Sequence, residues 1–248
     1  MTVVLKRLIT MTLPVPIRAW LRASWQDREY CPPVGSIRFG DLRRLTPVSR
    51  CWGYDRGLPI DRYYIEKFLL QYSTDIRGRV MEIGDDTYTQ KFGGRVTRSD
   101  VLHVLDGNPK ATIVGDLTQA DHIDSNRFDC IICTQTLHLI YDTRAAIKTL
   151  YRILQPGGIL LATFPGITPI SHSDWPEYWC WSFTTHSARL LFGEVFPPRS
   201  VRIDTYGNVL AATAFLQGLA VAELRKEELE SRDPDYEVII TVRATKPE

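Results

Sequence analysis

The chain has 248 residues, and its 30 Lys and Arg residues nearly balance 29 Asp and Glu residues for a net charge of +1. This length suffices for one domain with its own core and a modest appended segment. The balanced charge supplies no long-range field, so we expect neither nucleic acid nor an anionic membrane as a partner. The apolar runs are short, such as Ile159–Ala162, and none approaches the roughly twenty apolar residues that a membrane span requires.

The N-terminus and the cysteines indicate a reduced, cytoplasmic protein. Met1–Arg28 mixes basic and apolar residues, but Pro14, Pro16 and the lack of a small-residue cleavage site are unlike a signal peptide. The five cysteines are scattered and odd in number, as in proteins with reduced thiols. Cys130 and Cys133 share one apolar run, in which positions three apart on a strand point to opposite faces. No second Cys/His pair stands at metal spacing, so we expect no metal site.

Strands and helices alternate along the chain. Helical spacing predicts a lead-in helix over Ile60–Tyr72, with Asp61 as its cap. Two further helices are predicted, one over Thr143–Leu154, which Pro156–Gly158 ends, and one over Ala211–Glu230. Short apolar runs between turn residues predict seven strands, namely Arg79–Ile83, Val101–Val104, Ala111–Val114, Phe128–Cys133, Ile159–Phe164, Val201–Asp204 and Val238–Ala244. This order predicts an α/β fold with a doubly wound, mostly parallel seven-stranded sheet that helices cover on both faces.

The sequence suggests two parts. Residues 1–59 are expected to form an N-terminal arm and a helical or lid segment, which contains a stretch rich in Pro and Gly. Residues 60–248 are expected to form the sheet domain, with an insertion near 166–200 that covers the ligand.

The end of the first predicted strand, Glu82-Ile83-Gly84-Asp85, is the first place to look for a ligand. Ligands of open α/β sheets bind beyond the carboxyl ends of the strands, and Gly84 permits a tight turn there. Asp85 and Asp86 follow where a phosphate-binding loop would carry further glycines. Two carboxylates would repel a pyrophosphate, which argues against NAD, FAD or ATP. A cationic ligand without phosphate suits this turn better.

Four stretches carry a resemblance to a known family. They are Arg79–Gly94 (RVMEIGDDTYTQKFGG), Gly115–Leu117, Phe128–Leu139 (FDCIICTQTLHL) and Leu154–Phe164 (LQPGGILLATF). In order and spacing they resemble the class I S-adenosylmethionine (SAM)-dependent methyltransferases, over roughly Ile60 to Phe164. With the stretch Trp52–Gly57, the chain most resembles a subgroup of small-molecule methyltransferases that often occur beside glycosyltransferases in bacteria.

The resemblance implies SAM as the cofactor and assigns residues to it. Glu82 and Gly84 match the first SAM motif, with Gly84 next to the amino acid part of SAM, and Asp85 directly after Gly84 is a further candidate for binding the cofactor. Asp100 is the first candidate for the acid that accepts the ribose hydroxyls, and Asp106 is its rival.

The remaining assignments complete the cofactor site. Asp116 and Leu117 match the pair that flanks the adenine, and Thr134 and Gln135 match residues on the methionine side. Taken alone, Asp116 is also explained as a helix N-cap. The chain departs from the family at Asp86, which stands where the second glycine of the first motif is usual.

Three histidines are candidates for the base that a hydroxyl acceptor requires. His138 follows Gln135 in the loop after the fourth strand, where the resemblance places catalytic or gating residues; a packed turn with a satisfied histidine is the alternative. His172 and His186 flank the aromatic stretch Asp174–Phe183, which either covers the acceptor or closes the sheet as a hydrophobic plug.

The segment Tyr54–Tyr64 is dense in Arg, Asp and Tyr, and we interpret it as a lid. Arg56 or Arg62 would bind the SAM carboxylate through its guanidinium, and Tyr63 would donate a hydrogen bond to it. The alternative is a surface ion-pair cluster with neighbouring aspartates.

The sequence therefore predicts a cytoplasmic SAM-dependent methyltransferase that acts on a small-molecule acceptor, specifically a hydroxyl of a sugar-bearing compound or other secondary metabolite. The second hypothesis is a fold relative that binds SAM or its product S-adenosylhomocysteine (SAH) without methyl transfer, as a non-methylating enzyme or scaffold. A nicotinamide-dependent oxidoreductase is disfavoured by the acidic turn, and assembly into a homo-oligomer stays open.

Overall fold

The computed structural model describes residues 13–14, 17, 31–172 and 177–248. Most of Met1–Arg28 and the first part of the aromatic stretch, up to residue 176, therefore lie outside the described residues. The chain divides into two units, Met1–Thr46 and Pro47–Glu248. In the described part of the first unit, a 3-10 helix spans Gly40–Leu42. The expected boundary between residues 59 and 60 stays a prediction.

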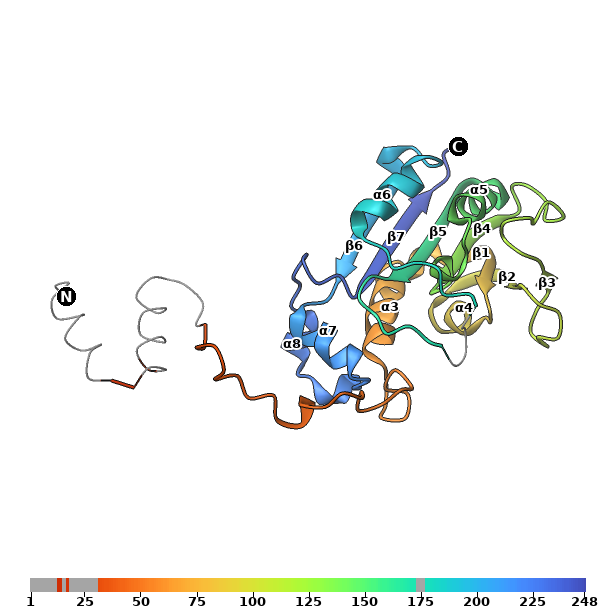
Figure 1. The fold of residues 1–248 in the computed structure, drawn as a ribbon. Helices are drawn as coiled ribbons and strands as arrows, with labels where there is room; N and C mark the ends of the chain where they lie inside the picture. The colour runs from red at the N-terminus through yellow and green to blue at the C-terminus, as the bar shows by residue number, and fades with distance from the viewer. Residues whose placement is uncertain (1–12, 15–16, 18–30, 173–176) are drawn as a thin grey trace. The chain divides into compact units, whose positions relative to one another are not determined.

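The second unit contains a seven-stranded sheet in the order β3-β2-β1-β4-β5-β7-β6 (Figure 1). Only β7 runs antiparallel to its neighbours, so the expected fold class is confirmed. The strands are β1 (Arg77–Ile83), β2 (Arg95–His103), β3 (Ile113–Val114), β4 (Phe128–Thr134), β5 (Leu154–Pro165), β6 (Val201–Tyr206) and β7 (Ile239–Thr245).

Helices cover both faces of the sheet (Figure 1). Side chains of α5 and α6 share one apolar core with one face of the strands, and side chains of α3 and α7 share a second core with the other face. The helices are α3 (Ile60–Gln71), α4 (Thr87–Phe92), α5 (Thr143–Ile153), α6 (Thr185–Gly193), α7 (Val209–Leu216) and α8 (Lys226–Glu230). In the described chain, no helix is both long and apolar enough to cross a bilayer.

The strand β4 shows why its sequence is a continuous apolar run. Cys130 belongs to the core under α3, whereas Cys133 belongs to the core under α5. Burial on both faces therefore requires apolar residues at every position. Burial also raises the pKa of the Cys133 thiol to about 12, so this thiol is inert at neutral pH.

Several expected boundaries were wrong. The second strand begins at Arg95 and not at Val101. Most of its first five residues are polar and exposed, so no apolar run marks its start in the sequence. The expected helix within Ala211–Glu230 is two short helices, α7 and α8, separated by a 3-10 turn. Asp61 lies inside the first turn of α3, whose N-cap is Pro59. The helices α4 and α6 were missed.

The residues Pro156–Gly158 do not lie between a helix and a strand. They lie inside β5, where Gly157 takes a φ of 76° and donates its N–H to Lys246 at 2.8 Å. Loops, and not helices, connect β2 to β3 and β3 to β4 in the described chain, which leaves part of the sheet without a helical cover.

Candidate active site

The candidate site lies at the carboxyl ends of β1 and β4, where the strand order reverses. The strands β1 and β4 are parallel neighbours, and the chain leaves them towards opposite sides of the sheet. Such a switch point is where open α/β sheets bind their ligands. Gly84 follows β1 directly, and Gln135 follows β4.

The turn after β1 leaves room for a ligand. Gly84 has a φ of 92°, which favours glycine, and no heavy atom lies within 4 Å of the position that a Cβ would take. Asn108 donates its Nδ2–H to the Gly84 carbonyl at 2.7 Å. A ligand can therefore approach the backbone of a turn that is held in place from the other side.

Glu82 lies beneath this turn and supports it. It is 2% exposed, and its carboxylate accepts hydrogen bonds from the backbone N–H of Tyr88 at 3.1 Å and of Thr89 at 2.7 Å, and from the Thr89 hydroxyl. Burial raises the pKa of Glu82 to about 7, against the effect of these hydrogen bonds. Glu82 thus fixes the first turn of α4.

The two acids that replace the usual glycines have different neighbours. Asp86 forms an ion pair with Lys110 at 3.1 Å and accepts a hydrogen bond from Gln90. Asp85 is exposed and accepts the Thr87 N–H at 2.9 Å. Lys110 was missed by sequence reasoning, because its partner lies 24 residues away and no local pattern links them.

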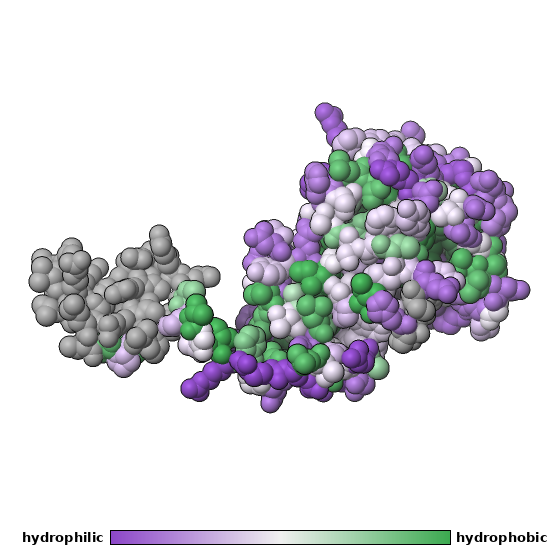
Figure 2. Space-filling view, viewed as in Figure 1, coloured by the Kyte–Doolittle hydropathy of each residue, from purple (hydrophilic) through white to green (hydrophobic). Residues whose placement is uncertain are grey.

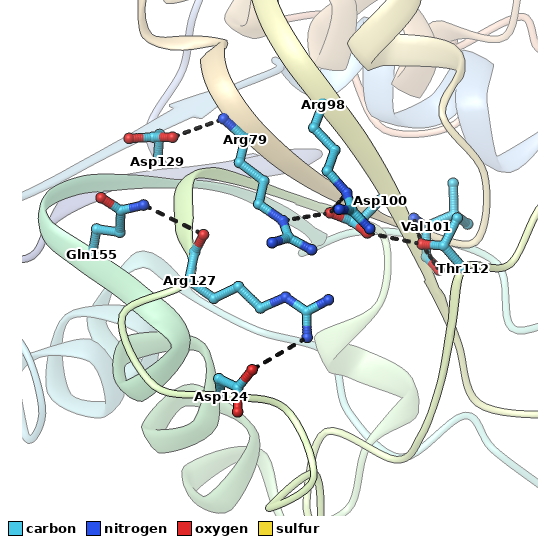
Figure 3. Close-up of polar contacts among 9 residues, drawn as sticks. All are labelled: Arg79, Arg98, Asp100, Val101, Thr112, Asp124, Arg127, Asp129 and Gln155. Atoms are coloured by element: carbon cyan, nitrogen blue, oxygen red, sulfur yellow. Dashed lines mark hydrogen bonds and ion pairs between the residues drawn. The ribbon is translucent and has the colours of Figure 1, made fainter.

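Asp100 does not lie at the end of its strand (Figure 3). It lies within β2 and is 1% exposed. Its carboxylate accepts the Arg79 Nε–H at 2.7 Å and the Thr112 hydroxyl at 3.3 Å, and Arg98 is 3.4 Å away. Although burial opposes it, the hydrogen bond and charge of Arg79 hold the pKa of Asp100 below its usual range. The expectation that Asp100 binds the ribose is corrected on this geometry, because its oxygens are used inside the sheet.

Acidic side chains do stand beyond the ends of β2 and β3. Asp106 is exposed in the loop after β2 and accepts the N–H of Gly107 at 2.8 Å. Asp116 is exposed after β3 and accepts the N–H of Thr118 at 2.8 Å, and the neighbouring Leu117 is buried. No helix follows Asp116, so it caps a turn and not a helix.

Exposed apolar side chains accompany these acids. Val104 and Leu105 follow β2, Val114 ends β3, and each is more than two-fifths exposed. Apolar residues also gather over α7, where Val209 and Leu210 are exposed, as Figure 2 shows. The strand ends therefore offer an apolar surface next to carboxylates, as a nucleoside would require.

The end of β4 is strained and has an unsatisfied donor. Gln135 has a φ of 48° although it is not glycine, and its backbone N–H is fixed by Thr163 at 2.8 Å. Its side-chain Nε2 is buried and has no hydrogen-bond partner among the described residues. Strained backbone and orphaned polar groups concentrate at functional sites. Thr134 ends the strand directly before Gln135 and is half-buried.

His138 lies in a 3-10 turn, Leu137–Leu139, after β4. It is 3% exposed, and its Nδ1 has no partner among the described residues. Burial, with the charge of Arg62, lowers the pKa of His138 to about 4. The imidazole is therefore neutral at pH 7.

The insertion after β5 packs onto this histidine. The Trp179 ring lies 4.5 Å from the His138 ring between centroids, and the backbone N–H groups of Cys180 and Trp181 donate to the His138 carbonyl. The Trp181 indole donates to the carbonyls of Ile140 and Tyr141. Trp179 was missed as an individual residue, because only the fold brings it to His138.

The other two candidate bases are not brought to this cluster by any contact in the described residues. His172 is exposed beside residues 173–176, and His186 is exposed in the first turn of α6. Next to α6, an open hollow of about 460 Å³ lies between the ends of β5 and β7, with Ile167, Phe183 and Glu237 in its wall.

The expected lid residues are paired with the chain itself. Arg56 binds Glu223, with its Nε 3.0 Å from Oε2, and Tyr63 donates its hydroxyl to Glu230. Arg62 donates to the Tyr54 hydroxyl at 2.7 Å and acts on the pKa of both Tyr88 and His138. The positive charge of Arg62 contributes to the lowered pKa of His138 and opposes the rise in the pKa of Tyr88.

Comparisons with known proteins agree with this fold. A family model described as a methyltransferase domain matches residues 88–162, and no curated protein matches the chain. The chain is similar to a structure of the Haloferax volcanii Trm112 methyltransferase activator with a methyltransferase, at 15% identity, with 79% of this chain and 94% of that chain covered and a TM-score of 0.50. It is also similar to a SAM-dependent methyltransferase from Archaeoglobus fulgidus (10% identity, 75% and 94% covered, TM-score 0.49) and to the [4+2]-cyclase SpnF (13%, 74% and 81%, TM-score 0.48).

The strand order and the matched domain define a class: the chain has the class I methyltransferase fold. The domain match supports SAM as the cofactor. The residues fit that group, since the open glycine turn is lined by carboxylates, which suit a cationic ligand.

Proposed function

We propose that the protein transfers the methyl group of SAM to a hydroxyl of a small molecule at the carboxyl ends of β1 and β4. The observation that carries the proposal is the buried, neutral His138, three residues beyond the strained Gln135 and across the switch point from the open turn at Gly84. The matched methyltransferase domain supports the reaction type.

The cofactor site of the proposal runs along three strand ends. Gly84 admits the amino acid part of SAM, with Gln135 on its methionine side. Asp106 accepts the ribose hydroxyls in place of Asp100, because Asp106 is exposed beyond the strand end. Asp116 accepts the adenine amine, and the exposed apolar residues beside it contact the base. Arg62 is the candidate for the carboxylate of SAM, since Arg56 is bound to Glu223.

Bound SAM supplies an electrophilic methyl group on a sulfonium. The work of the chain is to align the acceptor oxygen and to receive its proton. A neutral imidazole keeps a lone pair for that proton at pH 7, and the ring of Trp179 holds His138 in one orientation. His138 would receive the proton of the acceptor hydroxyl as its oxygen takes the methyl group that bound SAM would supply, with SAH as the other product.

The first test is calorimetric titration with SAH. We expect micromolar binding to the wild-type protein, and binding at least tenfold weaker to Asp116→Ala. Asp121→Ala is the matched control, because Asp121 is also exposed and lies in the same loop. Absence of binding to the wild-type protein would refute the cofactor assignment, and equal loss in both variants would refute the role of Asp116.

The second test separates methyl transfer from binding alone. Labelled SAM is offered with a panel of hydroxyl-bearing glycosides and phenols and with matched amines. Transfer to hydroxyl compounds supports the proposal, and transfer only to amines contradicts the acceptor class. SAH binding without transfer to any member of the panel favours the non-methylating alternative.

A further inference from the structure

Five arginines gather at the amino ends of neighbouring strands, at the end of the sheet opposite the candidate active site. We call them the arginine face: Arg77, Arg79, Arg95, Arg98 and Arg127. The register places Arg77 beside Arg95 and Arg79 beside Arg98, and Arg127 directly precedes β4. Like charges directly opposite on adjacent strands are destabilising, so two successive pairs of this kind need an explanation.

The chain neutralises this charge only in part. Asp100 binds both Arg79 and Arg98, and Asp124, which is 88% exposed in its side chain, lies 3.9 Å from Arg127. A third carboxylate, that of Asp129, accepts the backbone N–H of Arg79 at 2.7 Å. Only Asp100 and Asp124 lie within ion-pair distance of a guanidinium group, so in the described chain five guanidinium groups face two carboxylates.

Two of the arginines have no acidic partner. Arg77 and Arg95 are exposed and form no ion pair within the described ranges. Since each stands beside the other, an anion between them would relieve their repulsion.

The better-buried arginines retain unsatisfied donors. Arg79 Nη2 and Arg127 Nε are buried and have no acceptor among the described residues. Both guanidinium groups lie near the same Phe128 ring, at 5.4 and 5.5 Å from its centroid, and Figure 3 shows Arg79, Arg98 and Arg127 extending towards one region beside Asp100. A buried donor without an acceptor is unfavourable, so the chain itself leaves these two guanidinium groups incompletely satisfied.

The arginine face is accessible. The connections from β2 to β3 and from β3 to β4 are loops in the described chain, so no helix covers this part of the sheet. The residues of β2 from Thr97 to Ser99 are exposed, and the Arg98 side chain is 60% exposed.

We propose that the arginine face is a second binding site, separate from the methyl-transfer site, for a phosphate-bearing ligand. Planar guanidinium groups match the oxygens of phosphate in paired hydrogen bonds. A diphosphate fits best, because the arginines form two successive pairs across β1 and β2. Arg77 pairs with Arg95, and Arg79 pairs with Arg98. Arg77 and Arg95 bind one end of the ligand, and Arg98, Arg79 and Arg127 bind the other.

The test uses inorganic pyrophosphate as the probe, at ionic strength matched with sodium chloride. We expect pyrophosphate to raise the melting temperature of the wild-type protein and to bind with sub-millimolar affinity in calorimetry. In the double variant Arg77→Gln/Arg95→Gln, affinity falls at least fivefold. A merely structural role predicts that the double variant is less stable than wild type without ligand. The proposal predicts the opposite, because removal of two repelling, unpaired arginines leaves the unliganded protein at least as stable as wild type.

Arg199→Gln is the control, because Arg199 is exposed and lies outside the arginine face. No stabilisation of the wild-type protein by pyrophosphate overturns the proposal. So does an equal loss of affinity in the control, which would indicate a diffuse charge effect. SAH affinity stays unchanged in the double variant, so this test stands apart from that of the methyl-transfer site.

Discussion

Strand β1 leads at its carboxyl end to a buried glutamate and an open glycine, whereas its amino end carries two arginines beside two more on β2. At the carboxyl ends of the strands the unsatisfied groups include those of Gln135 and His138, on strained or tightly turned backbone. At the amino end they are guanidinium N–H groups of Arg79, at the start of β1, and of Arg127, directly before β4. The first arrangement suits a ligand enclosed by turns, and the second suits an anion that lies along a flat surface.

Two aspartates, Asp100 and Asp106, show how the body of a strand differs from the region beyond its carboxyl end. Asp100, inside β2, uses its carboxylate to hold two arginines. Asp106, just beyond the strand end, has no ion pair among the residues described. An aspartate in a strand body is therefore committed to the fold, whereas one beyond the strand end remains available to a ligand. Substitutions of Asp100 and Asp106 therefore have opposite expected effects on stability and on ligand binding.

The largest effect is expected at His138. Replacement by Gln removes the proton acceptor, and we expect the rate of methyl transfer to fall by about 10²–10⁴-fold, the range typical of a lost general base. Because the pKa of His138 is lowered to about 4, the wild-type rate should stay level as the pH falls through 6.5 and decline only near pH 4. Single-turnover transfer from labelled SAM across this range measures both.

His186→Gln is the control for this experiment, since His186 is exposed on α6. A loss of methyl transfer in His186→Gln as large as that in His138→Gln would contradict the assignment of the base to His138.

The second effect concerns Glu82, near the carboxyl end of β1, and the dependence of the free energy of unfolding on pH. Its pKa is about 7 in the folded chain against an ordinary 4.5, so the folded state holds this proton more tightly. Its contribution is fully present below pH 4.5 and is lost as the pH rises to about 7, on the order of 3 kcal/mol in total. Urea unfolding across this range should therefore show a decline that Glu82→Gln abolishes.

Glu227→Gln, at an exposed position of α8, should retain the wild-type decline. If Glu82→Gln keeps the same pH dependence as the wild type, the decline has another source and Glu82 is ionised throughout.

The third effect is the exchange of roles between the two aspartates. Asp100→Asn leaves Arg79 without its buried partner, and we expect a loss of about 2 kcal/mol in the free energy of unfolding, less than for a wholly buried pair because Arg79 is partly exposed. Its SAH affinity should stay near that of the wild type. Asp106→Asn should do the reverse, with unchanged stability and weaker SAH binding. Weaker binding in Asp100→Asn alone would restore Asp100 to the ribose.

The sequence predicted those features correctly in which the local environment demands one type of residue, such as glycine in a tight turn or apolar residues in a buried strand. Gly84 was recognised because a turn after an apolar strand favours glycine, and the structure gives it a positive φ. The strand β4 was recognised because burial on both faces demands an unbroken apolar run. The doubly wound, mostly parallel sheet was predicted from the alternation of helices and strands.

Prediction from the sequence failed where the answer depends on distant segments. Four of the five residues Arg95–Ser99 are polar and exposed, so no apolar run marks the start of β2 and Asp100 looks like a residue near the strand's beginning. The contact of Trp179 with His138 joins residues 41 positions apart, and the Lys110–Asp86 ion pair joins two loops. No local periodicity encodes such contacts.

The smallest effect is expected from a pair of glycines on either side of α4. Gly84→Ala places a methyl group in the open space where we propose the cofactor lies, on backbone with a φ of 92°. Strain of about 1–2 kcal/mol in this left-handed conformation would lower stability, and the methyl group would weaken SAH binding by about tenfold, equivalent to about 1.4 kcal/mol.

Gly94→Ala is the control, because its added methyl group also meets open space but its φ is not positive. We expect its SAH affinity to equal that of the wild type. If both variants bind SAH as tightly as the wild type, the space beside Gly84 does not hold the cofactor. The turn after β1 would then serve only the fold, and the carboxyl end of β1 would have no part in binding SAM.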